Sequence, residues 1–124
     1  MKTESSPHSR LTLAQRQGQA AEDQALAFLQ QKGLCLVARN IRFRVGEIDL
    51  VMRDREVVVF VEVRFRRSSR FGGPAETVGY QKQQRVRRAA SLWLIQACLM
   101  GRAPCRFDVV AITADRLEWI VGAF

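Results

Sequence analysis

The run at residues 57–64, Val-Val-Val-Phe-Val-Glu-Val-Arg, constrains the fold more than any other part of the chain. β-Branched and aromatic side chains favour strands, and consecutive apolar residues predict a strand that is buried on both faces. Such a strand belongs at the centre of a sheet that is covered by helices on both sides. Glu62 ends the apolar run, and a carboxylate placed there needs a cation, hydrogen bonds or water, because its desolvation is costly.

Two helices and further strands surround this central strand. Apolar residues recur at steps of three and four over residues 11–32 and again within 76–100, which predicts two helices, the first of which ends at Gly33. Residues 46–53 and 57–64 read as a hairpin that turns at residues 54–55. The other expected strands are residues 34–38 and 41–45 on either side of Asn40, residues 106–113 and residues 117–121.

The order of these elements predicts an α/β fold with a mixed central sheet flanked by helices. We expect one domain over residues 11–124, preceded by a flexible tail at residues 1–10. That tail lacks the apolar centre of a signal peptide, and no apolar run approaches the roughly 20 residues that cross a bilayer. Three cysteines, an odd number, exclude a disulfide framework, and Cys35, Cys98 and Cys105 are expected as small core side chains. A cytoplasmic protein without a membrane partner follows.

The basic charge is concentrated in one part of the chain. Twenty Lys and Arg residues against twelve Asp and Glu residues give a net charge of +8. Residues 64–88 hold eight of the cations and a single acid, Glu76. A solvated basic surface is the simple reading, whereas arginine's planar fork favours phosphate groups. The candidates for contacts with nucleic acid are Arg66, Arg67, Arg70, Arg85 and Arg88.

Three carboxylates are predicted to converge on the sheet. If the hairpin turns at residues 54–55, Asp49 lies opposite Phe60 and diagonal to Glu62 on the same face, with Cβ atoms about 7 Å apart. Like charges this close repel, and a divalent metal with oxygen ligands is the simple remedy. Glu22 falls within or beside the apolar stripe of the first helix and could add an oxygen, although it could equally reach solvent.

Two cations could reach Glu62. Arg64 lies two residues further along the strand and therefore on the same face, so an ion pair at a solvated strand end is the simpler reading of Glu62. Lys82 lies four residues before Val86, in line with the buried face of the second helix, and either approaches the carboxylates or extends into solvent. A cationic rim around an acidic centre suits cleavage of a phosphodiester, because the rim holds phosphates and the carboxylates hold a metal.

These residues resemble a known family. The stretches at residues 46–50 and 59–64 are similar to the Asp…Glu-x-Lys core of the PD-(D/E)xK, restriction-endonuclease-like superfamily. More closely, roughly residues 14–124 resemble the YraN family of small bacterial proteins. The motifs that carry this resemblance are Gly18 with Glu22, Asn40, Gly46-Glu47-Ile48-Asp49-Leu50, Phe60-Val61-Glu62-Val63, Arg67, Phe71-Gly72, Val78, Lys82, Arg106-Phe107-Asp108-Val109 and Ala123-Phe124.

The resemblance implies a restriction-endonuclease-like α/β/α core, similar to that of archaeal Holliday-junction resolvases. It further implies nucleic-acid binding, with DNA favoured over RNA, and a Mg²⁺- or Mn²⁺-dependent endonuclease acting on branched or damaged DNA. Carried over residue by residue, Glu22, Asp49 and Glu62 match the acidic ligands, and the Val63 carbonyl is an additional metal ligand. Because resolvase-like relatives pair as dimers, a homodimer is a further expectation.

One position departs from the superfamily pattern. Arg64 stands where the superfamily usually has lysine, and arginine stays protonated, so it stabilises negative charge but cannot act as a general base. Lys82 is a substitute donor, and Asp108 is expected to have a structural role in which it pairs with an arginine. Three functions stay open at this point: a metal-dependent endonuclease, a non-catalytic nucleic-acid-binding protein that uses the same basic face, and an adaptor whose basic face docks an acidic subunit.

Overall fold

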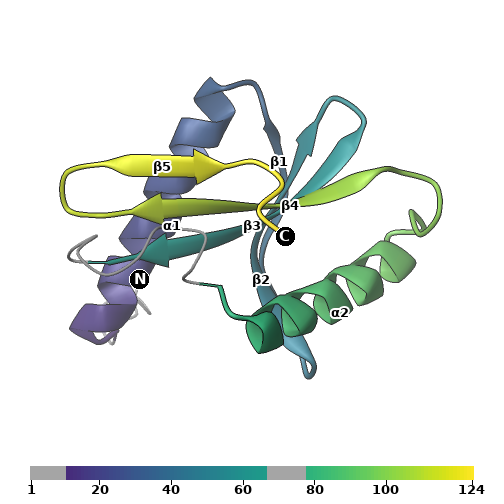
Figure 1. Cartoon of the computed structure of the whole chain (residues 1–124), viewed down its shortest axis with the longest axis horizontal. Helices are drawn as coiled ribbons and strands as arrows, with labels where there is room; N and C mark the ends of the chain where they lie inside the picture. Colours follow the sequence, from purple (N-terminus) through teal and green to yellow (C-terminus); the bar gives the residue numbers. More distant parts are fainter. Residues whose placement is uncertain (1–10, 67–77) are drawn as a thin grey trace, which may run out of the picture.

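Five strands form one mixed sheet with a helix on each side (Figure 1). The computed structural model describes residues 11–66 and 78–124. The strands lie side by side in chain order, and only β3 and β4 run parallel. The predicted α/β fold with a mixed sheet is confirmed. The elements are α1 (Leu13–Gln31), β1 (Cys35–Phe43), β2 (Gly46–Asp54), β3 (Val57–Phe65), α2 (Tyr80–Gln96), β4 (Cys105–Ile112) and β5 (Leu117–Ile120).

The central strand β3 separates two apolar clusters. Val59 and Val61 pack towards α1 with Leu29, whereas Phe60 packs towards α2 with Val86. Alternate residues of a strand point to opposite faces, so the uninterrupted apolar run of β3 fills both clusters. The strand is therefore the buried centre that the sequence predicts.

The ends of α1 follow from local chemistry. Thr12 and Gln15 form a capping box at the start of the helix, where each side chain accepts a hydrogen bond from the other residue's backbone N–H. At the other end Gly33 adopts a φ of +99°, and the Leu34 N–H donates to the Leu29 carbonyl. A residue with positive φ at this place is the usual end of a helix, so the predicted stop at Gly33 is confirmed.

The register of the β2–β3 hairpin differs from the predicted one by two residues. The turn comprises residues 55–56, with Arg55 at a φ of 60°, and Asp54 still pairs with Val57 in the ladder. Asp54 stays in the strand because its carboxylate accepts a hydrogen bond from Arg106 Nη1 at 3.1 Å. A shift of two residues preserves the faces of the paired residues, and the last pair of the ladder, Leu50 with Val61, is directly followed by Asp49 on one strand and Glu62 on the other.

The two short runs expected around Asn40 form a single strand, β1. Asn40 takes a φ of 56° inside it, and the pairing with β2 shifts between Leu36 and Ala38. Asparagine tolerates this left-handed conformation better than most residues, because its short polar side chain can hydrogen-bond locally. Asn40 is therefore an irregularity within a strand and not a break between two strands.

The three cysteines are exposed, which corrects the expectation that they pack in the core. Cys35 and Cys105 are the first residues of β1 and β4, and Cys98 lies after the end of α2 with a φ of 61°. Apolar neighbours in the sequence therefore misled the prediction, because each cysteine stands at an element boundary where the chain reaches the surface.

Asp108 is completely buried in β4 and joins the C-terminal part of the chain to the sheet. Its carboxylate accepts hydrogen bonds from Arg106 Nε at 3.0 Å, Trp119 Nε1 at 3.0 Å and the Gly122 N–H at 2.9 Å. The expected pairing with an arginine is present. None of the helices within the described parts of the chain is long and apolar enough to cross a membrane.

Candidate active site

The ladder between β2 and β3 ends at the pair Leu50 and Val61, and the two strands separate beyond it. From that point β2 continues beside β1, and β3 continues beside β4. The Val63 N–H, which faces the resulting gap, donates a hydrogen bond to Asp49 Oδ2 at 2.8 Å. Because the amide and carbonyl of one strand residue point to the same edge, the Val63 carbonyl faces this gap as well. We call Asp49, Glu62 and Val63 the strand fork.

Glu62 is the most constrained charge in the strand fork. Its side chain is buried, with Oε2 lying 3.2 Å from Lys82 Nζ and 3.8 Å from Arg64 Nη1. Burial raises the pKa of Glu62, the negative charge of Asp49 raises it further, and the two cations oppose these effects, which together leave it at about 7. The structure thus brings Lys82 and Arg64 to the same carboxylate.

Asp49 has the same electrostatic character. Burial raises the pKa of its carboxyl above the ordinary value, against the hydrogen bond from the Val63 N–H and the charge of Lys82. Raised pKa values mean that the surroundings stabilise the negative charge of these two neighbouring carboxyl groups less well than water does. The strand fork is therefore a place where an added cation would be favourable.

Glu22 approaches Asp49 from α1. Burial raises the pKa of Glu22, and the charge of Asp49 is the second cause. Arg39 Nη2 lies 3.6 Å from Glu22 Oε1 and also binds Asp23 Oδ1 at 2.8 Å. Asp49 therefore acts electrostatically on both Glu22 and Glu62, whereas Arg39 partly neutralises Glu22.

The central position of Asp49 results from a change of face in β2. Leu50 packs in the cluster beneath α1, but Ile48, two residues away, packs in the cluster beneath α2. Residues two apart on a regular strand share a face, so the alternation reverses at Asp49. The alternation of β1 reverses at the same level. Arg39 pairs with Leu50 and Ile41 pairs with Ile48, so the reversal falls at Asn40, the residue with positive φ. Asp49 consequently lies between the layers of α1 and α2.

The structure supplies some of the ligands expected for a divalent metal, but not all of them. Within residues 11–66 and 78–124, no group of three His, Cys, Asp or Glu side chains is placed to hold a metal ion. Asp49, Glu62 and the Val63 carbonyl nevertheless offer only oxygen atoms at one gap, which is the donor chemistry that Mg²⁺ and Mn²⁺ prefer. The raised pKa values of the two carboxyl groups fit a cation there. Glu22 is not assembled with them as a third ligand.

A cationic cavity lies beside the strand fork, between α2 and the tip of the β1–β2 hairpin. It has a volume of about 310 Å³, and its lining includes Arg44, Glu47, Lys82 and Arg85. Arg85 was expected near nucleic acid, but Arg44 was missed, because the alternating pattern at residues 41–45 was interpreted only as a strand with one solvated face. That alternation was the signal that could have identified it.

The remaining predicted cations occupy different places. Arg88 is exposed on α2, and Arg66 is exposed just after β3. Arg67 and Arg70 lie outside the described residues, as does the expected tail at residues 1–10. Arg87 lies over the rings of Phe107 and Phe124, at 5.1 and 5.5 Å from their centroids. Arg87 therefore packs against aromatic rings, which gives it a structural role.

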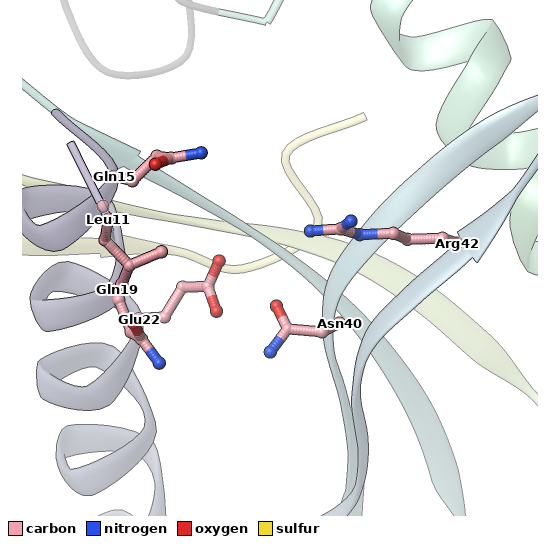
Figure 2. A pocket seen from close by; sticks show the side chains of 7 residues that line it. Leu11, Gln15, Gln19, Glu22, Asn40 and Arg42 are labelled. Atoms are coloured by element: carbon pink, nitrogen blue, oxygen red, sulfur yellow. The ribbon is translucent and has the colours of Figure 1, made fainter. Parts of the chain in front are cut away.

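A second cavity, of about 350 Å³, lies between α1 and β1 and was not expected from the sequence. Figure 2 shows the Glu22 carboxylate projecting from α1 towards Asn40 and Arg42 on β1. We call this cavity the α1–β1 pocket. Its lining residues are Leu11, Gln15, Gly18, Gln19, Glu22, Asn40 and Arg42.

Comparison with known proteins identifies close relatives over most of the chain. The family model described as "Uncharacterised protein family UPF0102" matches residues 21–112. A UPF0102 protein of Yersinia enterocolitica is 54% identical over 105 residues, covering 83% of this chain and 89% of the relative. One from Shewanella amazonensis is 54% identical over 107 residues (86% and 97%), and one from Pseudomonas putida is 50% identical over 114 residues (88% and 93%).

Proposed function

The chain belongs to the UPF0102 (YraN) family that its motifs resemble, and from the strand fork we propose that it binds nucleic acid and hydrolyses DNA phosphodiester bonds with a divalent metal. One observation carries the proposal. Two neighbouring carboxyl groups with raised pKa values, Asp49 and Glu62, lie at the strand fork beside Lys82 and Arg64. This supports the proposal because acidic side chains beside cations are what the resemblance to the PD-(D/E)xK superfamily implies around the bond to be cleaved.

Each residue of the site has a role in this proposal. Asp49, Glu62 and the Val63 carbonyl would hold Mg²⁺ or Mn²⁺, with Glu22 taking part through water. When bound, the ion supplies an activated water and positive charge for the phosphate oxygens. Arg64 steadies a phosphate oxygen, because its guanidinium stays charged throughout. Lys82 supplies the ammonium group that the superfamily places on the strand.

Nucleic-acid binding follows from the cations around the strand fork. Lys82 and Arg85 line the cationic cavity with Arg44, and Arg64 approaches the same Glu62 oxygen as Lys82. Arginine forms two parallel hydrogen bonds to a phosphate, which suits a surface that positions a strand. The backbone on either side of the scissile phosphate would therefore contact the hairpin tip and the end of β3.

The activity is tested with purified protein, Mn²⁺ or Mg²⁺, and labelled branched, single-stranded and duplex DNA. We expect cleavage of at least one substrate and a loss of more than about 100-fold in Asp49→Asn and Glu62→Gln, because loss of an outer-shell partner alone typically costs 10- to 100-fold. Glu56→Gln, in the exposed β2–β3 turn, is the matched control and should cleave normally. Cleavage that persists in Asp49→Asn would exclude this site.

Metal binding has a readout that does not depend on cleavage. A ligand that binds only the folded protein at about 100 times its dissociation constant stabilises it by about 2.7 kcal/mol. We therefore expect Mn²⁺ to raise the melting temperature of the wild-type protein but not that of Asp49→Asn. An equal rise in the two proteins would place the ion elsewhere.

A non-catalytic nucleic-acid-binding protein is the second candidate, and one observation favours it. Lys82 already lies 3.2 Å from Glu62, and Arg64 stands where a lysine is usual, so the cations can neutralise the strand fork without a metal. Arg64→Lys discriminates between the two candidates. If this variant cleaves DNA and the wild-type protein only binds it, arginine was the block and the second candidate holds for the natural chain.

A further inference from the structure

The α1–β1 pocket lies next to the strand fork but contains none of its three residues. Its volume is about 350 Å³, which is within the range of small-molecule sites. Glu22 connects the two places, because it lines the pocket and its pKa is raised by Asp49. A strand whose phosphate lies at the fork would therefore have the pocket within reach.

Gly18 keeps the α1–β1 pocket open at a cost in helix stability. It lies inside α1, where glycine destabilises a helix by about 0.5–1 kcal/mol relative to alanine. A Cβ built on Gly18 meets no atom within 4 Å, so close packing does not require glycine there. Gly18 also lines the pocket. A side chain at this position would project into the cavity, and its absence keeps the cavity open.

Asn40 adds a second cost at the same pocket. It has a positive φ of 56° in the middle of β1, a conformation that asparagine adopts more readily than most residues but that still costs free energy relative to a regular strand. Its amide faces the pocket opposite the Glu22 carboxylate (Figure 2). Two residues that are unfavourable for their own elements thus meet at one cavity, which is typical of a binding site and not of a packing defect.

The chemistry of the lining selects the occupant. Gln19 and Asn40 each offer an amide that both donates and accepts hydrogen bonds, Glu22 accepts them, and Arg42 presents a planar guanidinium. Planar pairs of donors and acceptors match the edge of a nucleobase, and an arginine plane can stack on its face. Leu11 adds an apolar wall.

We propose that the α1–β1 pocket takes one unpaired nucleobase of a strand bound at the strand fork. This inference rests on the proposed function and names its substrate class: nucleic acid with an unpaired or extruded nucleotide. A fully paired duplex would use only the cations around the fork. Unstacking costs least where a base already lacks a partner, so branched, bulged or single-stranded sites would be preferred.

The test fills the pocket without disturbing its walls. Gly18→Phe projects into open space, and Ala20→Phe, on an exposed position of the same helix, is the matched control. Binding is measured for two duplexes that differ only in one bulged nucleotide. We expect the wild-type protein to favour the bulged duplex by about tenfold, Gly18→Phe to lose that preference, and Ala20→Phe to keep it. Equal affinity of the wild-type protein for both duplexes would overturn the proposal, as would an equal loss for both in Gly18→Phe.

A second measurement separates the pocket from the proposed function. Deoxynucleoside monophosphates are titrated into ¹⁵N-labelled protein, with inorganic phosphate as the control. We expect the side-chain amide signals of Gln19 and Asn40 to shift with the nucleotides and not with phosphate, and Gly18→Phe to abolish the shift. If neither duplex binds at low salt, the proposed function fails and this titration alone decides the pocket. Shifts with phosphate alone, or none with nucleotides, would show that no base is bound.

Discussion

Glu62 carries a charge that opposes folding at neutral pH. Its pKa rises from 4.5 to about 7 in the folded protein, chiefly through burial, so the folded state holds its proton longer than the unfolded chain does. Between these two values the folded state binds more protons, and stability falls as the pH increases. In the absence of metal, we expect this group to stabilise the protein at about pH 5 by on the order of 2–3 kcal/mol relative to about pH 8.

Urea unfolding at these two pH values measures the effect. Glu62→Gln removes the titrating group while keeping a polar side chain for Lys82, so the difference between the two pH values should shrink by most of that amount. Glu56→Gln, in the exposed turn of the same hairpin, should leave the wild-type profile unchanged. A Glu62→Gln profile that parallels the wild-type one would show that the carboxyl is solvated.

Asp108 illustrates the opposite case, a buried carboxylate whose partners are complete. Three donors converge on it, from Arg106, Trp119 and the backbone of Gly122. Removing one partner of a buried ion pair costs about 3–5 kcal/mol, because the other charge is left unpaired. We expect Asp108→Ala to lose that much free energy of unfolding in urea, whereas Asp115→Ala, in an exposed turn, should lose less than about 0.5 kcal/mol. Similar losses in the two variants would contradict the structural role.

At the scale of elements, Gly46 sets how closely the β1–β2 hairpin approaches α2. A Cβ at Gly46 would lie 2.5 Å from the Arg85 carbonyl oxygen and 2.9 Å from its carbon, and backbone atoms cannot turn aside as a side chain can. We expect Gly46→Ala to destabilise the protein by about 1–3 kcal/mol and to weaken DNA binding, since it separates Arg44 from Lys82.

Gly18→Ala is the matched comparison for Gly46→Ala. It adds the same methyl group inside a helix, where no atom lies within 4 Å, and should stabilise the protein by about 0.5–1 kcal/mol. Thermal melts of the two variants provide the measurement. A Gly46→Ala protein as stable as the wild type would show that the hairpin can shift without cost.

The sequence predicted the elements and the faces of β2 and β3 because both depend on local periodicity. An even shift keeps the paired residues of β2 and β3 on their predicted faces, so the error of two residues still left Asp49 beside Glu62, although the alternation of β2 reverses at Asp49. The register itself depended on Asp54, which reads as a turn residue in the sequence. Its contact with Arg106, more than fifty residues away, keeps it in the strand. Such long-range contacts leave no local signal.

Other features of the site also could not be predicted from local sequence patterns. The reversal of face at Asp49 and Asn40 contradicts the period of two on which strand predictions rest. The α1–β1 pocket depends on how α1 and the residues of β1 that are distant from it in the sequence approach each other in space. The convergence of Lys82 with Glu62, by contrast, could be expected, since the central strand and the helix stripe each indicated a buried face.

At the scale of the whole molecule, several of the described cations lie at the end of the sheet that holds Asp49 and Glu62. Asp49 lies towards the start of β2 and Glu62 towards the end of β3, which is the end where the hairpin tip presents Arg42 and Arg44. Arg53 lies at the opposite end of β2, beside the β2–β3 turn. The cations at the end that holds Asp49 and Glu62 add a local attraction for phosphate groups to the net charge of +8.

This arrangement predicts how salt weakens DNA binding. Each phosphate that a cation neutralises contributes about −0.9 to the slope of log K against log salt concentration on duplex DNA. If Arg44 and Arg85, which line the cationic cavity, each contact a phosphate, the double variant Arg44→Ala/Arg85→Ala should bind generic duplex more weakly and with a slope shallower by about 2. Arg53→Ala, an exposed arginine at the far end, should keep the wild-type slope. Anisotropy titrations between about 50 and about 200 mM salt measure these slopes, and equal changes in the two proteins would show that the cations act only through net charge.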